Sequence, residues 1–212
     1  MVTAENIMDN KCVFLTSDGL SDRMQELFFK RMGKARELIK VIVVPTAGIC
    51  SDGARESFAI CLHELMKMGI QYENIMVYNL ELLLSKGYAR TYSSYISRIP
   101  MIARLLTAEE LKTFDAIIVS GGEGSVLCTE MNRTGLVSEL GQAVKEGLVY
   151  VGISAGSMFA AGTFENGLHL IENPIIPHWD GEPMLDFPDD NRDIHLKDGQ
   201  AVYIHDDRIE LL

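Results

Sequence analysis

The sequence predicts an α/β fold in which a mostly parallel, open sheet is covered by helices on both faces. Short apolar runs, mostly rich in β-branched residues, predict buried parallel strands at residues 12–16, 41–45, 75–79, 116–120 and 148–153. Amphipathic stretches between them predict helices at residues 22–32, 54–68, 108–114 and 134–146. Such alternation gives right-handed crossovers and places ligands at the carboxyl ends of the strands.

The C-terminal part follows a different pattern. Residues 168–171, 201–204 and 208–211 are strand-like, and Asp206-Asp207 predicts a tight turn that would close an antiparallel hairpin. The tyrosine-rich segment 80–106 is long for a plain connection and could hold a helix, an insertion over the site, or a surface for a homodimer. Because no repeat or linker composition interrupts the chain, we expect residues 1–212 to form a single domain.

Composition limits the classes of partner. Against 19 basic residues the chain has 30 acidic ones, a formal net charge of -11, whereas nucleic-acid and anionic membrane surfaces attract basic clusters. A small molecule or peptide is the expected partner. Four scattered cysteines, with no Cys-x-x-Cys pair, favour reduced thiols in a cytoplasmic protein. No targeting segment or membrane span is found, so we expect a soluble protein. No metal-ligand spacing is found either, and we expect no metal and no cofactor.

The most informative motif is Gly-Ile-Ser-Ala-Gly-Ser at 152–157, between an apolar run and a helix-like stretch. A serine there would occupy a strand-to-helix turn that exposes its hydroxyl above the sheet. Ser154 is therefore the candidate nucleophile. The alternative is an ordinary strand end followed by a helix that begins with small residues.

A serine hydroxyl needs a base to remove its proton. His178 is the best of five histidines, because two prolines stiffen its approach and apolar neighbours could exclude water. The other reading is a histidine packed beside Trp179. The remaining histidines lie on an amphipathic helix, in a strand-like run, in a charged stretch and beside an acidic turn, at His63, His169, His195 and His205.

The orienting carboxylate has two candidates. Asp180 lies two residues from His178, and Asp198 precedes a glycine turn and a strand, where a solvated turn aspartate is the alternative. Backbone donors for an oxyanion could come from the amide of Ala155 and from the glycine-rich loop 120–124.

In this order the motifs resemble those of the peptidase E (aspartyl dipeptidase) and cyanophycinase family of serine peptidases. The likeness covers most of the chain and is densest at 151–157. It implies a flavodoxin-like fold related to the class I glutamine amidotransferases, with a Ser154–His178–Asp198 triad. Gly122 and Ala155 would then supply oxyanion amides, and Gly121, Glu123 and Ser157 would lie beside the substrate.

The chain also departs from the family. Where relatives read Gly-Gly-Asn, this sequence has Glu123 after Gly121-Gly122, and no arginine is identifiable as the reader of an aspartyl side chain. An acid here would repel an aspartyl group but could hold an α-amino group. The segments after Ala161 and between His178 and Asp198 are also short.

Two functions are consistent with these observations. The first is a serine peptidase that hydrolyses small peptides through an acyl-enzyme, acting as a dipeptidase or exopeptidase with aspartyl dipeptides among the expected substrates. The second is a non-catalytic amino-acid or peptide-binding protein on the same fold, which Glu123 and the shortened loops favour. Ligand stabilisation without turnover would identify the second.

Overall fold

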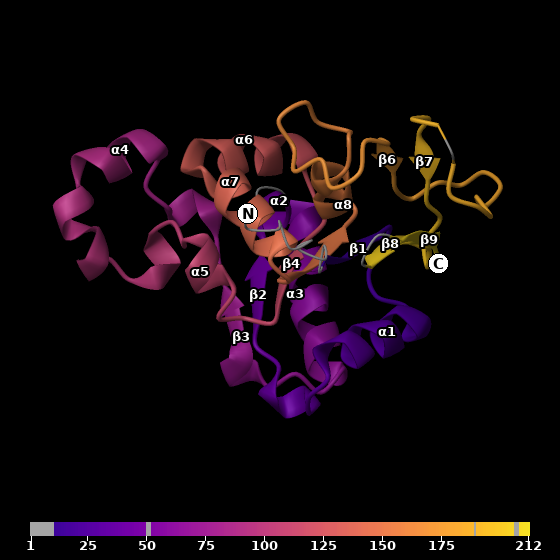
Figure 1. Ribbon diagram of the computed structural model, residues 1–212, viewed down its shortest axis with the longest axis horizontal. Coiled ribbons are helices and arrows are strands. Elements are labelled where there is room, and N and C mark those ends of the chain that lie inside the picture. Colours follow the sequence, from indigo (N-terminus) through magenta and orange to yellow (C-terminus); the bar gives the residue numbers. More distant parts are fainter. Residues whose placement is uncertain (1–10, 50–51, 189, 206–207) are drawn as a thin grey trace, which may run out of the picture.

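The computed structural model describes residues 11–49, 52–188, 190–205 and 208–212. A seven-stranded sheet in the order β3-β2-β4-β5-β1-β8-β9 forms its centre (Figure 1). Its strands are β1 (Cys12–Thr16), β2 (Val41–Val44), β3 (Ile75–Val77), β4 (Ala116–Val119), β5 (Val149–Ile153), β8 (Ala201–His205) and β9 (Arg208–Leu211). The first five in chain order are parallel, whereas β8 pairs antiparallel with both β1 and β9. The predicted α/β fold and C-terminal hairpin are thus confirmed; the predicted turn at 206–207 lies outside the described residues.

Helices cover both faces of the sheet (Figure 1). On one face α1 and α3 pack against side chains such as Phe14 and Val151. On the other face α5, α6, α7 and α8 pack against side chains such as Leu15 and Tyr150. The α-helices are α1 (Asp22–Met32), α2 (Thr46–Ile49), α3 (Asp52–Lys67), α4 (Lys86–Thr91), α5 (Ala108–Leu111), α6 (Gly124–Thr134), α7 (Leu136–Lys145) and α8 (Ala155–Ala160). Because both faces are buried, the central strands are continuously apolar.

Helix α1 illustrates how local sequence sets these elements. Asp22 in its first turn and two basic residues in its last complement the helix dipole. Gly33 ends the helix with a left-handed φ of 61°. Met24 and Phe28, four residues apart, are fully buried, and each such side chain stabilises the fold by about 1.5–3 kcal/mol.

The connection 80–106 consists of α4 and three 3-10 segments, Leu80–Leu82, Ser93–Arg98 and Met101–Ala103. It projects from the side of the molecule that carries β3, away from the C-terminal hairpin (Figure 1). Tyr88, Tyr92 and Tyr95 are exposed on it, and the first two rings stack with centroids 6.3 Å apart. A homodimer through this segment stays a prediction.

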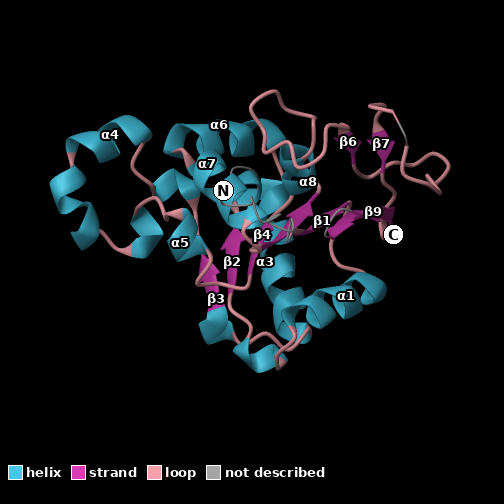
Figure 2. Cartoon of the chain, viewed as in Figure 1, coloured by secondary structure: helices cyan, strands magenta, loops and turns pink. Residues whose placement is uncertain are grey.

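One local expectation was wrong, and one helix was not predicted. Residues 168–171 form no strand, because the amides of Leu168 and Leu170 bond to the carbonyls of Phe159 and Ala160 at the end of α8. The polar stretch after β4 forms α6, which the apolar pattern does not reveal. Between α8 and β8 the chain is mostly loop (Figure 2), apart from two strands of two residues that pair in parallel, β6 (Ile175–Ile176) and β7 (Ile194–His195).

Among the described residues, no helix combines the length and apolar character needed to cross a membrane.

Candidate active site

Ser154 occupies the turn between β5 and α8, with the strained angles φ 48° and ψ −105°. Its amide donates to the carbonyl of Thr16, 3.0 Å away, so the turn is held against the end of β1. Its own carbonyl accepts from Met158 and thereby starts the helix. The serine therefore stands where the strand stops and the helix begins, as the motif predicts.

Glycines flanking Ser154 are required by close packing. A Cβ atom on Gly156 would lie 2.2 Å from the carbonyl oxygen of Val119 on the neighbouring strand. A Cβ atom on Gly152 would lie 2.7 Å from the backbone of Gly156 itself. The Gly-x-Ser-x-Gly spacing thus lets the first turn of α8 fold back onto β5 and β4 without collision.

His178 and Asp198 complete a chain of hydrogen bonds with Ser154. The His178 Nε2 atom lies 3.1 Å from Ser154 Oγ, and the Nδ1 atom lies 2.7 Å from Asp198 Oδ1. His178 also has a left-handed backbone, with φ 56°. The histidine stands between a hydroxyl and a carboxylate, in the order that general-base activation of a serine requires.

Strand pairing explains why His178 and Asp198, which are 20 positions apart in the sequence, meet. Strands β6 and β7 pair Ile176 with His195, and the amide of Trp179 continues this pairing by donating to the carbonyl of Leu196. His178 and Asp198 are consequently neighbours at the end of a small two-stranded sheet. Strand β8 then begins beside the end of β1, with Ala201 opposite Thr16, so the pair lies over the carboxyl edge of the main sheet.

Ser17 bonds both His178 and Asp198, and no sequence motif singled it out. Its buried hydroxyl donates to Asp198 Oδ1 at 2.8 Å and accepts from the backbone amide of His178 at 2.8 Å. Together with the His178 bond, this donor holds the pKa of Asp198 below its ordinary value, the Ser17 hydroxyl having the larger effect. Its position directly after β1, at a predicted ligand-binding strand end, was the available signal.

The other four histidines have different surroundings. His195 stacks on Trp179 with ring centroids 4.1 Å apart, and His205 bonds Glu210 at 2.9 Å. His169 Nε2 lies 3.0 Å from a backbone carbonyl, and His63 is exposed on α3. Of the two candidate acids, Asp198 rather than Asp180 accepts from the His178 ring.

The glycine loop after β4 lies directly against Ser154. A Cβ atom on Gly121 would lie 3.2 Å from the Ser154 Cβ atom, and both Gly121 and Gly122 line the adjoining cavity. Gly122 has φ +133°, and a Cβ atom there would lie 2.1 Å from the carbonyl oxygen of Ala47. Only glycine allows this close approach. Ala155, the first residue of α8, follows the serine directly.

Two residues that were expected beside the substrate make hydrogen bonds within the protein. Ser157 is fully buried and its hydroxyl lies 2.7 Å from the carbonyl of Thr16 and 2.8 Å from that of Gly152, so it supports the turn instead of facing a substrate. The Glu123 carboxylate caps α6, accepting from the amide and hydroxyl of Ser125. Neither residue lines the cavity.

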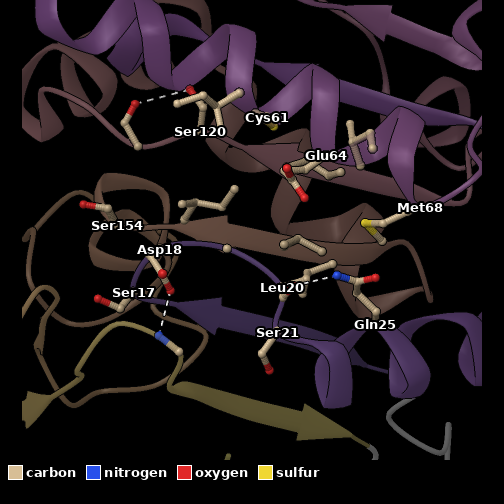
Figure 3. Close-up of a pocket in the computed structure, with 18 of the residues that line it drawn as sticks. Ser17, Asp18, Leu20, Ser21, Gln25, Cys61, Glu64, Met68, Ser120 and Ser154 are labelled. Atoms are coloured by element: carbon tan, nitrogen blue, oxygen red, sulfur yellow. Dashed lines mark hydrogen bonds between the residues drawn. The ribbon is translucent and has the colours of Figure 1, made fainter.

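A cavity of about 480 Å³ opens beside Ser154 (Figure 3), and His178 also lines it. Its volume falls within the usual range for small-molecule sites. From Ser154 and His178 the cavity extends over the sheet between α1 and α3. Within the part of the chain that the structure describes, no group of three or more His, Cys, Asp or Glu side chains could hold a metal ion.

Fold and site together define the class: an α/β protein with a serine on a strand-to-helix turn, facing a histidine and an aspartate. The model of peptidase family S51 matches residues 103–212, a region that includes all three side chains. The chain belongs to this family.

Individual relatives are more distant. Peptidase E of Streptomyces coelicolor is 40% identical over 62 residues, or 28% of this chain. The alignments span between 26% and 46% of the length of the curated relatives that the chain matches. Two solved structures share the fold at 19% identity over 95% of this chain. A candidate peptidase E from Listeria monocytogenes is covered to 98% with a TM-score of 0.59, and a peptidase from an acI-B1 actinobacterium to 87% with a TM-score of 0.61.

Proposed function

We propose that this protein is a serine peptidase that hydrolyses small peptides through an acyl-enzyme. The observation that carries the proposal is the continuous chain of hydrogen bonds from Ser154 through His178 to Asp198, built on a strained turn beside a cavity. Membership of peptidase family S51 supports the same reaction class.

Acylation begins when Ser154 Oγ attacks the carbonyl carbon of the scissile bond and His178 Nε2 takes the hydroxyl proton. The carbonyl oxygen becomes an oxyanion, and the backbone amides of Gly122 and Ala155 are the proposed donors to it. When the C–N bond breaks, His178 returns the proton to the leaving amine. The acid half of the peptide stays on Ser154 as an ester.

Deacylation repeats the steps with water. His178 removes a proton from the water as its oxygen attacks the ester carbon, and then protonates Ser154 Oγ as the second product leaves. Asp198 stays ionised throughout, accepts from His178 Nδ1–H and stabilises the imidazolium that forms twice per cycle. The low pKa of Asp198 is consistent with this role.

Hydrolysis of a library of dipeptides and short peptides, read by mass spectrometry, tests the proposal. The parent protein is compared with its Ser154→Ala variant, and a fluorophosphonate probe reports separately on the reactivity of the serine. We expect cleavage and probe labelling by the parent alone. A parent protein that cleaves no peptide and leaves the probe unreacted would contradict the proposal and favour the binding protein, which a ligand-induced thermal shift would detect.

A further inference from the structure

The cavity beside Ser154 is elongated and has two distinct ends. In Figure 3, Ser154 and Ser17 lie at one end, whereas Gln25 of α1 and Met68 lie at the other. Cys61 and Glu64 reach it from α3. A group bound at Ser154 could thus extend a side chain along the face of the sheet.

The walls of this cavity are mostly apolar. Its apolar lining residues come from the sheet, from α1 and its approach and from α3 and its end, namely Leu20, Ile60, Leu65, Met68, Ile118, Val151 and Ile153. Burial raises the pKa of the Cys61 thiol to about 12, so this residue lines the wall as a neutral group. The Gln25 amide already donates to the carbonyl of Leu20 at 2.9 Å.

The carboxylates that line the cavity give it an acidic rim. Asp18 and Glu64 are carboxylates of the lining, and the lining residues in the described part of the chain include no lysine or arginine. Both acids lie at the rim. Asp18 is exposed and accepts from the amide of Gly199, while Glu64 is half-exposed and pairs with Lys67 at 3.0 Å. The inner part of the cavity is lined by the buried apolar side chains of Leu65, Ile118 and Val151, which carry no charge that could pair with a bound group.

We infer that this cavity receives the side chain of the residue whose carbonyl is attacked, and that this side chain is neutral and aliphatic, of the size of leucine or methionine. The inference rests on the proposed peptidase function. An aspartyl side chain would lose its hydration without gaining a cationic partner and would meet the two rim carboxylates. A lysine side chain would bury its ammonium where Glu64 already pairs with Lys67 and Asp18 already accepts from the amide of Gly199.

Phosphonate probes test this inference independently of the leaving group. We would use diphenyl 1-aminoalkylphosphonates that carry the side chains of leucine, methionine, aspartate or lysine. Ser154 Oγ attacks phosphorus and phenol leaves, which gives an adduct visible by intact mass. We expect the leucine and methionine probes to react about 100-fold faster than the aspartate probe. Faster reaction of the aspartate or lysine probe would overturn the inference, while labelling at Ser154 would leave the proposed function standing.

A matched pair of variants places the discrimination in this cavity. Ile60 lines its rim and is 59% exposed, so Ile60→Arg adds a cation without disturbing the core. Met66→Arg makes the same change on an exposed position of α3 outside the lining. We expect Ile60→Arg to reduce the leucine-to-aspartate rate ratio about fivefold and Met66→Arg to leave it unchanged. Equal ratios in the two variants would contradict the assignment. If the parent protein forms no adduct with the aminoalkylphosphonates or with the fluorophosphonate, the proposed function itself fails.

Discussion

The two halves of the candidate site are held by different kinds of structure. Ser154 stands on a turn between a central strand and a helix, and its glycine neighbours pack against the backbone of the turn itself and of the adjoining strand β4. His178 and Asp198 lie in the loop-rich region 162–200, where regular strand pairing among the described residues is limited to β6 and β7 (Figure 2). The hydrogen bonds from Ser17 to these residues span 161 and 181 positions in the sequence.

This contrast shows that local backbone conformation positions one part of the site and that contacts between distant segments position the other. The nucleophile half is determined by backbone conformation and close contact, so its geometry can be read from a short motif. The base and acid half is determined by polar contacts between distant segments, which form only when the fold is complete. Mutations of the glycines around Ser154 should therefore act mainly through folding, and mutations of His178 and Asp198 mainly through turnover.

The largest expected effect is on turnover, in the second half. His178→Ala should reduce kcat/KM by about 10³ to 10⁶ because no group remains to take the serine proton. The free energy of unfolding should change little, since the side chain is half-exposed. His195→Ala, which removes the neighbouring histidine stacked on Trp179, is the matched control and should retain turnover within about tenfold. Equal losses in the two variants would show that His178 is not the base.

The next effect concerns stability in the first half. Gly156→Ala should lower the free energy of unfolding by about 3 kcal/mol or more, because its Cβ atom would meet the Val119 carbonyl oxygen at 2.2 Å. Urea denaturation measures the change. Gly87→Ala on α4 has open space at the Cβ position and should be neutral or stabilising by about 0.4–1 kcal/mol. A Gly156→Ala protein as stable as its parent would argue against the tight turn.

A smaller effect is expected at Ser17, whose hydroxyl bonds both residues of the second half. Ser17→Ala removes the donor to Asp198 and the acceptor for the His178 amide, so kcat should fall about 10- to 100-fold with a smaller change in KM. The pKa of Asp198, now held low chiefly by Ser17, should rise toward its ordinary value, which NMR titration would detect. Ser125→Ala, which removes a hydroxyl bonded to Glu123, is the control. An unchanged Asp198 titration would rule out the positioning role.

The smallest effect lies outside both halves and provides a reference for pH. Bidentate bonding to Arg104 lowers the pKa of Glu110 to about 2 from 4.5. Since the folded value is depressed, the stabilisation is present above pH 4.5 and is lost as pH falls toward 2. Allowing for partial exposure, we expect a loss of about 1–2 kcal/mol over this window in the parent. Glu110→Gln should remove it without affecting kcat; an identical pH profile of unfolding would contradict this.

Some expectations from sequence failed for identifiable reasons. Residues 168–171 have the alternation of a strand, but their amides are used by carbonyls at the end of α8. Ser157 follows the nucleophile motif, yet its small hydroxyl is buried by bonds to two strand carbonyls. Glu123 was expected near the substrate; its carboxylate caps the first turn of α6, and a substrate contact stays a prediction. At 168–171 and at Ser157 a local pattern was overridden by where backbone donors and acceptors found partners.

The sequence alone determined the alternating fold, the turn at Ser154 and the preference for His178, because periodicity and glycine sterics act over a few residues. Only the tertiary structure showed that Asp198 and not Asp180 bonds His178, that Ser17 bonds Asp198, and that an apolar, acid-rimmed cavity lies between α1 and α3. These features depend on strand pairing and helix packing, which bring together residues more than a hundred positions apart. A short sequence pattern cannot predict contacts between residues that are so far apart in the chain.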